Sequence, residues 1–344
     1  MKRTAASTFI TAPRPGCPLC GGSGQVLYGG LLDRYFDAPG EWSMRSCQDP
    51  SCGLVWIDPV VGRANVGVLY ARYYTHDEAD RPVDWLRRMH RALTEIYARQ
   101  RIGSGSLALA PLAGAIAAFH PAGNSELHHA VLHLPRTKRG QRLLDVGTGS
   151  AKHLTRLVKF GLEVEGIEPD PAAAEAARRS GLNVTVGDFM THEYKNSIFD
   201  FVTMSHVIEH VHEPLEAFRR AFNVLVPGGR LVVSTPNIDS RGHRRYGRNW
   251  SMLDAPRHLT LFDQRTIGIL AVKAGLEVQE VRTTVCYARE VFVISNRLSV
   301  EPTRQPSLIL GVKDSLRGIP YQLGERFRLH GDGEELVMLA SKPS

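Results

Sequence analysis

The chain has 344 residues, which is long for one compact domain and sufficient for two. Hydrophobic residues make up 43% and charged residues 22%, as in ordinary globular proteins, and no apolar stretch reaches the roughly 18 residues that a membrane span needs. The net charge of +7 (42 basic minus 35 acidic side chains) is consistent with an anionic substrate, but the basic residues are too scattered for a long nucleic-acid track. The basic segment 1–15 lacks the apolar core of a signal peptide, so a cytoplasmic location is expected.

Four of the five cysteines lie in two short pairs near the N-terminus, Cys17-Pro-Leu-Cys20 and Cys47-Gln-Asp-Pro-Ser-Cys52. Two such pairs, separated by a spacer, are typical of a tetrahedral zinc site with four thiolate ligands. In a chain without a secretory signal, clustered cysteines favour metal binding over disulfides. Because four protein ligands leave zinc no open position, the site is predicted to be structural. The sequence therefore predicts a small zinc ribbon over residues 1–60.

Residues 61–138 are predicted to form a helical connector. The range 84–101 has an apolar stripe at helical spacing and a basic opposite face, which is expected to be solvated. The apolar range 107–119 is expected to be buried, with peripheral contact to a membrane surface as the alternative.

Residues 139–344 alternate short apolar runs with helical patterns, which predicts an α/β fold with a mainly parallel sheet and crossover helices. A helix is expected over 263–274 and an extra helix or lid within 285–333. The lone Cys286 is expected to be a small buried apolar side chain. Strands are expected over 142–146, 162–167, 276–284 and 334–341, and the family resemblance given below implies three more within 183–189, 199–206 and 225–234.

A glycine-rich turn, Asp145-Val-Gly147-Thr-Gly149, follows the first of these strands. Glycines at such a turn let the backbone approach a cofactor closely, and an acidic residue about 20 positions later accepts hydrogen bonds from ribose hydroxyls. Here Glu168 ends the second strand, 21 residues after Gly147. This arrangement indicates a nucleotide-type cofactor, and by itself it is also found in NAD enzymes.

The run Leu143–Gly149 resembles the first motif of class I S-adenosylmethionine-dependent methyltransferases, and later segments match that family in order over about 140–235. The resemblance implies a Rossmann-like seven-stranded methyltransferase sheet with S-adenosylmethionine as cofactor. Carried over by position, it implies that the glycine turn shapes the methionine and ribose pocket, that Glu168 binds the ribose diol, and that Asp188 and Phe189 hold the adenine. Alternatively, Asp188 caps the next segment and Phe189 is a core residue. The predicted cofactor-binding set is Asp145, Gly147, Gly149, Glu168, Asp188, Phe189 and Ser205.

A narrower resemblance covers the ribbon running into residues 53–59, together with residues 206–211 and 254–262. These segments are similar to methyltransferases associated with sugar and cell-surface polysaccharide biosynthesis, which implies a sugar among the candidate acceptors. Zinc-ribbon sugar C-methyltransferases share this front end, but they carry a further C-terminal domain for which this chain has little room.

Two histidines are the predicted catalytic residues. His206 lies at the end of the fourth strand, where ligands of doubly wound sheets bind, and His258 follows the fifth strand. A histidine is suited to accept a proton from an oxygen nucleophile near neutral pH. A structural hydrogen-bonding role is the alternative for His206. A further alternative is a catalytic metal site built from His206, Glu209, His210 and His258, since small-RNA terminal methyltransferases have a similar stretch.

The range 241–250 contains four arginines, a tyrosine and a tryptophan, which suit the binding of phosphates and a ring. A solvated, mobile loop is the alternative. The sequence thus predicts methyl transfer to a small or lipid-linked anionic metabolite. RNA methylation is a second hypothesis, and a non-catalytic ribbon module with a degenerate core is a third. The joint presence of Asp145, Glu168 and Asp188 argues against the third.

Overall fold

The computed structural model describes residues 10–63, 125–149, 151–300, 312–326 and 331–344, together with 69, 92 and 94–99. Residues 92 and 94–99 are helical, within the helix predicted for 84–101. The rest of that range and the apolar range 107–119 lie outside the described residues. None of the helices in the described part of the chain combines the length and apolarity needed to span a membrane.

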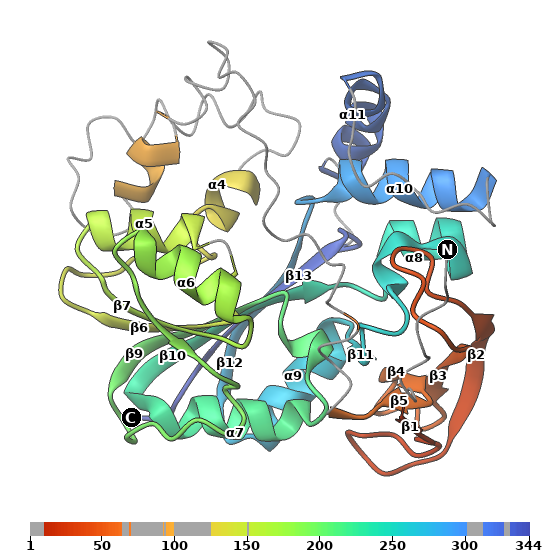
Figure 1. The fold of residues 1–344 in the computed structure, drawn as a ribbon, viewed down its shortest axis with the longest axis horizontal. Helices are drawn as coiled ribbons and strands as arrows, with labels where there is room; N and C mark the ends of the chain where they lie inside the picture. Colours follow the sequence, from red (N-terminus) through yellow and green to blue (C-terminus); the bar gives the residue numbers. More distant parts are fainter. Residues whose placement is uncertain are drawn as a thin grey trace, which may run out of the picture.

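A seven-stranded sheet forms the centre of the molecule, with the order β12-β13-β10-β9-β6-β7-β8 (Figure 1). β13 runs antiparallel to both of its neighbours, and the pairs among β10, β9, β6, β7 and β8 are parallel. The predicted α/β class and seven-stranded methyltransferase-type sheet are confirmed. The strands are β6 (Arg142–Val146), β7 (Glu163–Glu168), β8 (Asn183–Val186), β9 (Phe199–Ser205), β10 (Leu225–Pro236), β12 (Glu277–Thr284) and β13 (Glu335–Ser341).

Helices cover both faces of this sheet and bury a separate core on each. On one face lie α5 (Lys152–Lys159) and α6 (Pro171–Arg179), and on the other α7 (Pro214–Val224) and α9 (Gln264–Lys273) (Figure 1). Local sequence sets where these helices begin. Asp170 accepts a hydrogen bond from the Ala172 amide at 2.8 Å and precedes Pro171, a residue type favoured at the first helical position. Asp263 forms a capping box with Thr266.

A second sheet of four strands lies beside the large one, in the order β11-β4-β3-β2. β2 (Gly24–Leu31), β3 (Trp42–Cys47) and β4 (Val55–Asp58) belong to the predicted ribbon, whereas β11 (Thr260–Leu261) comes from the later chain. The short strands β1 (Thr11–Ala12) and β5 (Val60–Val61) pair nearby. Buried residues from 31–57 and 238–261 share one hydrophobic core. The ribbon therefore packs as one unit with the segment that follows the fifth parallel strand.

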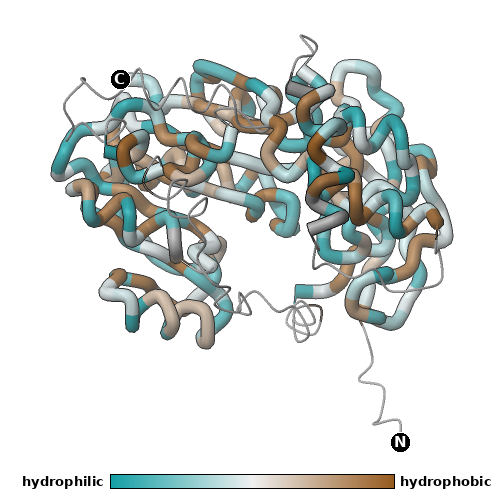
Figure 2. Tube along the Cα trace, turned by 90° about the horizontal axis from the view of Figure 1, so that it is seen from above, coloured by the Kyte–Doolittle hydropathy of each residue, from teal (hydrophilic) through white to brown (hydrophobic). Residues whose placement is uncertain are grey.

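The remaining helices lie in two places (Figure 1). α8 (Arg241–Tyr246), α10 (Ala288–Val300) and α11 (Val312–Arg326) lie near the ribbon, whereas α4 (Ser125–His129) lies near α5. The chain also forms short 3-10 turns, η3 (Ile208–His210), η4 (Gly247–Asn249) and η5 (Ser251–Leu253). α10 and α11 are the additional helical structure expected within 285–333. Figure 2 shows the large sheet with its helices on one side and the ribbon with the segment after β10 on the other, with hydrophobic stretches in both.

Candidate functional site

The glycine turn between β6 and α5 has a backbone that only glycine adopts easily. Gly147 and Gly149 have φ values of +73° and +52°, in the left-handed region. A Cβ added to Gly147 would lie 2.5 Å from Cγ2 of Val207, so this glycine also lets the segment after β9 approach the turn. The Gly147 amide donates to the Ile167 carbonyl at 2.9 Å. The turn is therefore held between the ends of β7 and β9.

Glu168 is a buried carboxylate at the end of β7, directly beneath the turn. Its Oε2 accepts from the Gly149 amide at 2.8 Å and its Oε1 from the Asp170 amide at 3.0 Å. A carboxylate oxygen has two lone pairs, so each oxygen retains the capacity to accept one further hydrogen bond. The geometry suits the predicted recognition of two ribose hydroxyls.

Asp145 is a second buried carboxyl group at this place. Burial raises its pKa to about 7, and the charge of Glu168 raises it as well, although Thr203 donates a hydrogen bond at 2.5 Å. Within the described part of the chain, neither Asp145 nor Glu168 forms an ion pair with a basic side chain. Two buried acids without a cation favour a positively charged ligand. S-adenosylmethionine carries a sulfonium and an ammonium group, so these residues fit it.

The other predicted cofactor residues divide between the sheet edge and the core. Asp188 is exposed after β8, and its Oδ1 accepts from the Met190 amide at 2.8 Å, so it caps the following turn. Ser205 is half-buried, with its Oγ 3.1 Å from that of Ser234. Phe189 is packed in the core against α7, which favours the structural alternative for its ring.

His206 sits between two buried carboxylates and has a left-handed φ of +53°. Its Nε2 lies 3.0 Å from Glu335 Oε1 and its Nδ1 lies 3.2 Å from Glu209 Oε1. Burial alone would lower the pKa of the imidazole, but the two carboxylates outweigh it and raise the pKa to about 10. With both ring nitrogens protonated, the side chain has no lone pair with which to accept a proton. The geometry favours the structural role for His206 over that of a general base.

Glu335 is the residue of this site that sequence reasoning missed. It begins β13, is buried, and accepts a hydrogen bond from Thr284 Oγ1 at 2.7 Å in addition to its contact with His206. Its Oε2 lies 3.4 Å from Nε2 of His133. A glutamate at the start of a final strand carries no local signal for burial, because its partners come from distant parts of the sequence.

Glu209, His210 and His258 form a compact group whose possible ligand atoms all lie within 4.8 Å of one another. Nδ1 of His210 donates to the Arg257 carbonyl at 3.0 Å, and Nδ1 of His258 donates to the Met252 carbonyl at 2.7 Å. In each neutral ring the lone pair is therefore on Nε2. Burial lowers the pKa of His210 to about 4, which keeps this ring neutral. The group is suited either to accept a proton at His258 or to hold a divalent cation.

A second group with similar spacing, His129, His133 and Glu335, is a poorer candidate for a metal. Arg282 has only donors, and one of its terminal nitrogens lies 3.2 Å from Nδ1 of His133. Nδ1 must therefore accept, so Nε2 carries the proton and faces Glu335. A protonated nitrogen cannot coordinate a cation, so the arrangement of this group disfavours a metal site.

The four cysteines of the ribbon converge as the sequence predicts. The Sγ atoms of Cys17 and Cys52 are 3.6 Å apart, those of Cys20 and Cys47 are 3.4 Å apart, and all four lie within 4.8 Å. Zinc–sulfur distances of about 2.3 Å in a tetrahedron require sulfur separations of about 3.8 Å, so the cluster fits zinc closely. Cys286 is buried elsewhere, as expected.

Within the arginine-rich range 241–250, residues 241–249 form α8 and η4, which disfavours the alternative of a solvated loop. Arg244 pairs with Asp239 at 2.6 Å and with Asp332 at 2.9 Å. Arg241 lies 4.7 Å from the centre of the Tyr321 ring. Two of the four arginines predicted to bind phosphates, Arg241 and Arg244, therefore contact other residues of the chain, whereas Arg248 faces a cavity described below.

Residues 120–281 match a family model described as a methyltransferase domain. Demethylmenaquinone methyltransferase of Corynebacterium efficiens is 32% identical over 104 residues, which cover 29% of this chain and 45% of that protein. Ubiquinone biosynthesis O-methyltransferase of Alkalilimnicola ehrlichii is 32% identical over 111 residues, covering 30% and 45%. The matched regions thus span less than half the length of these curated relatives.

Among solved structures, a methyltransferase of Thermotoga maritima, described as a possible histamine N-methyltransferase, has a TM-score of 0.45 and 20% identity. The match covers 80% of this chain and 99% of that one. The family match therefore shows a methyltransferase domain over residues 120–281, slightly less than half of the chain.

Proposed function

We propose that the chain is an S-adenosylmethionine-dependent methyltransferase that acts on a small molecule. The observation that carries this proposal is the pair of buried acids, Asp145 and Glu168, beneath a glycine turn and without a cationic partner in the described part of the chain. When bound, S-adenosylmethionine supplies an electrophilic methyl group. Glu168 would accept the ribose hydroxyls, and Asp145 would stabilise the positive charge of the cofactor.

The acceptor would bind beyond the ends of β9 and β10, where His206 and His258 lie. In this proposal His258 removes the proton of an oxygen or nitrogen nucleophile through Nε2, because its Nδ1 is tied to the Met252 carbonyl. His206 does not exchange a proton. It lines the site as an imidazolium ion held by Glu209 and Glu335. Alignment of the nucleophile with the methyl group supplies much of the rate.

The finer substrate proposal is a small or lipid-linked anionic metabolite, with a sugar among the candidates. The quinone-biosynthesis methyltransferases matched above support a small-molecule acceptor. RNA is disfavoured, because Arg241 and Arg244 are used in internal contacts. A non-catalytic module is disfavoured by the intact hydrogen bonds of Glu168.

The ribbon is proposed to hold one structural zinc ion through Cys17, Cys20, Cys47 and Cys52. A helix of the methyltransferase domain contacts the first cysteine pair, since Lys273 donates from α9 to the Leu19 carbonyl at 2.9 Å. Zinc binding would therefore stabilise the packing of the ribbon on the domain.

A second candidate mechanism is metal-assisted transfer at Glu209, His210 and His258. It is favoured by the Nδ1 hydrogen bonds to backbone carbonyls, an arrangement common behind metal-ligating histidines. If it applies, methyl transfer will need a divalent cation and will be lost in His210→Ala. If His258 acts alone as a base, transfer will persist after removal of every metal except the ribbon zinc.

The test of the main proposal is binding of S-adenosylmethionine by calorimetry to wild type, Glu168→Ala and Glu163→Ala. Glu163 lies on the same strand but is exposed, so it is the matched control. We expect one site in the wild type and the control, with affinity reduced at least about tenfold in Glu168→Ala. No binding by the folded wild type, or equal affinity in all three proteins, would refute the proposal.

A further inference from the structure

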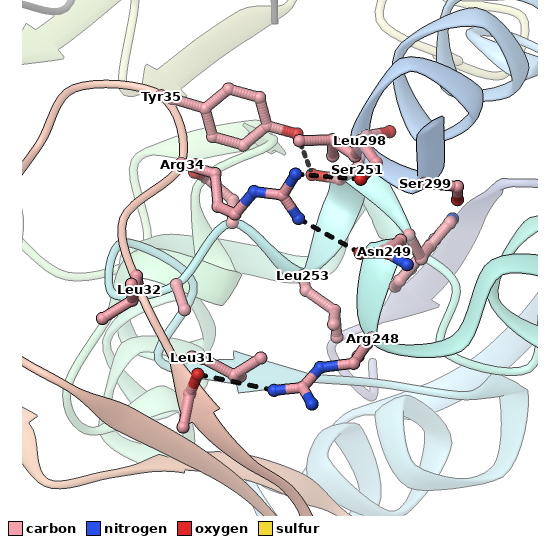
Figure 3. Close-up of a pocket in the computed structure, with 14 residues that line it drawn as sticks. Leu31, Leu32, Arg34, Tyr35, Arg248, Asn249, Ser251, Leu253, Leu298 and Ser299 are labelled. Atoms are coloured by element: carbon pink, nitrogen blue, oxygen red, sulfur yellow. Dashed lines mark hydrogen bonds between the residues drawn. The ribbon is translucent and has the colours of Figure 1, made fainter. Parts of the chain in front are cut away.

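A cavity of about 380 Å³ lies between the ribbon and the segment that follows β10 (Figure 3). This volume is within the range of small-ligand sites. The loop between β2 and β3 forms one wall, and η4, η5 and the end of α10 form the others. The lining combines two arginines with four leucines. We call it the arginine pocket, and the residues used below are Arg34, Arg248, Leu31, Leu32, Leu253 and Leu298.

Arg34 is held in a fixed position on one side of the arginine pocket. Its two terminal nitrogens donate to Asn249 Oδ1 at 3.1 Å and to the Leu298 carbonyl at 2.9 Å. The adjacent residue, Asp33, is buried and accepts two hydrogen bonds from Arg257 at 2.8 and 2.9 Å. Because these hydrogen bonds hold both Arg34 and its neighbour Asp33, the guanidinium group of Arg34 is positioned before any ligand binds.

Arg248 faces the same cavity from η4 (Figure 3). It donates to the Gly29 carbonyl at 2.7 Å, and within the described residues it forms no ion pair with a carboxylate. Asp254 also lines the pocket, but its carboxylate is bound by Arg257. Burial lowers the pKa of Arg34, and the positive charge of Arg248 lowers it further. An anion in the cavity would relieve this repulsion.

The apolar part of the pocket extends to its rim. Leu31, Leu253 and Leu298 are buried in the wall, whereas Leu32 is 59% exposed. Val300, two residues beyond Leu298, is 70% exposed. Arg248 is exposed and Arg34 is half-buried, so two charged groups and an apolar wall line the same cavity. This lining suits a ligand with one anionic part and one apolar part.

We propose that the arginine pocket binds an amphipathic anion, with its phosphate or carboxylate at Arg34 and Arg248 and its apolar group on the leucines. The pocket shares one loop with the predicted base. Ser251, Leu253 and Asp254 line the pocket, and the intervening Met252 carbonyl orients His258. A ligand in the pocket would thus be sensed directly by the loop that positions His258.

The experiment is calorimetric titration of the full-length protein with decyl phosphate, inorganic phosphate and decanol. We expect decyl phosphate to bind at least about tenfold more tightly than the other two probes, and Arg248→Ala to weaken it by about tenfold. Arg219→Ala, an exposed arginine of α7, is the matched control and should bind like wild type. Leu32→Ser should weaken decyl phosphate but leave inorganic phosphate unchanged. Equal binding by Arg248→Ala and Arg219→Ala, or no binding of decyl phosphate, would overturn the proposal.

Two parallel measurements are made. Vesicle flotation distinguishes a membrane lipid from a soluble ligand, and S-adenosylmethionine affinity distinguishes failure of the pocket proposal from failure of the proposed function. Flotation with phosphatidylcholine vesicles containing phosphatidic acid, lost in Arg248→Ala, would identify a membrane lipid. Binding of decyl phosphate without flotation would identify a soluble metabolite. S-adenosylmethionine affinity is measured on the same samples. A protein that binds S-adenosylmethionine but not decyl phosphate refutes the pocket alone, and one that binds only decyl phosphate refutes the proposed methyl transfer but not the anion site.

Discussion

Replacement of Glu335 by Gln tests the buried charge cluster at the edge of the sheet. The variant keeps the shape of the side chain and an oxygen that accepts from Thr284 Oγ1, but it removes the negative charge 3.0 Å from His206 Nε2. His206 then depends on Glu209 alone for the stabilisation of its imidazolium form. The substitution therefore breaks one half of a buried ion-pair arrangement without creating a cavity.

The expected loss follows from the pKa of His206. A rise from 6.5 to about 10 corresponds to about 5 kcal/mol of interaction with the charged ring, shared between Glu209 and Glu335. We therefore expect Glu335→Gln to lower the free energy of unfolding by about 2–3 kcal/mol at neutral pH, near the lower end for broken buried pairs. Because the folded pKa is raised, this stabilisation is complete below pH 6.5 and is lost as the pH rises through about 10.

The assay is urea denaturation of wild type, Glu335→Gln and Glu280→Gln at neutral pH and near pH 10. Glu280 is an exposed residue of β12 that lies 3.3 Å from Arg282, so its replacement should change stability by less than about 0.5 kcal/mol. The gap between wild type and Glu335→Gln should narrow at the higher pH. The reasoning is wrong if Glu335→Gln costs no more than Glu280→Gln, or if the gap is the same at both pH values.

Three further predictions concern the glycine turn, the proposed base and the ribbon. Gly147→Ala should abolish measurable S-adenosylmethionine binding by calorimetry, because its Cβ would clash at 2.5 Å, whereas Gly140→Ala has a similar φ of +78° with nothing within 4 Å and should retain binding. His258→Asn should lower kcat about 100-fold in a methyl-transfer assay while leaving cofactor affinity unchanged, since it retains a donor but loses the lone pair at Nε2; an unchanged kcat would remove His258 from the mechanism. Cys20→Ser should reduce zinc content measured by mass spectrometry and lower the Tm by several degrees, whereas Cys286→Ser should leave one zinc bound. Equal zinc content in both cysteine variants would contradict the ribbon site.

Much of the fold could be predicted because its signals are local. Strand β6 was expected at Arg142–Val146 and begins and ends there, since its apolar run is bounded by polar residues and the glycine turn. Asp170 and Pro171 specify the start of α6 through a hydrogen bond within three residues. Each such feature depends on neighbours in the sequence, so no knowledge of the tertiary structure was needed.

The candidate site was predicted only in part, because some of its residues meet through contacts between distant parts of the sequence. Glu168 could be identified because the distance along one strand–helix–strand unit places it beneath the glycine turn. The role of His206 could not, because Glu335, which holds its charge, lies 129 residues away in sequence.

Sequence by itself determined the α/β class, the cysteine cluster and the glycine turn with Glu168 beneath it, because periodicity, capping and motif spacing act over short ranges. Tertiary structure alone decided three other features. β11 pairs with the ribbon strand β4, which joins the two sheets into one packed unit. The buried carboxylate of Glu335 meets His206 only because β13 runs antiparallel beside β10, so that its first residue reaches the edge where β9 ends. Arg34 and Arg248 face one cavity because hydrogen bonds join segments more than 200 residues apart, and only the folded chain brings such charges together.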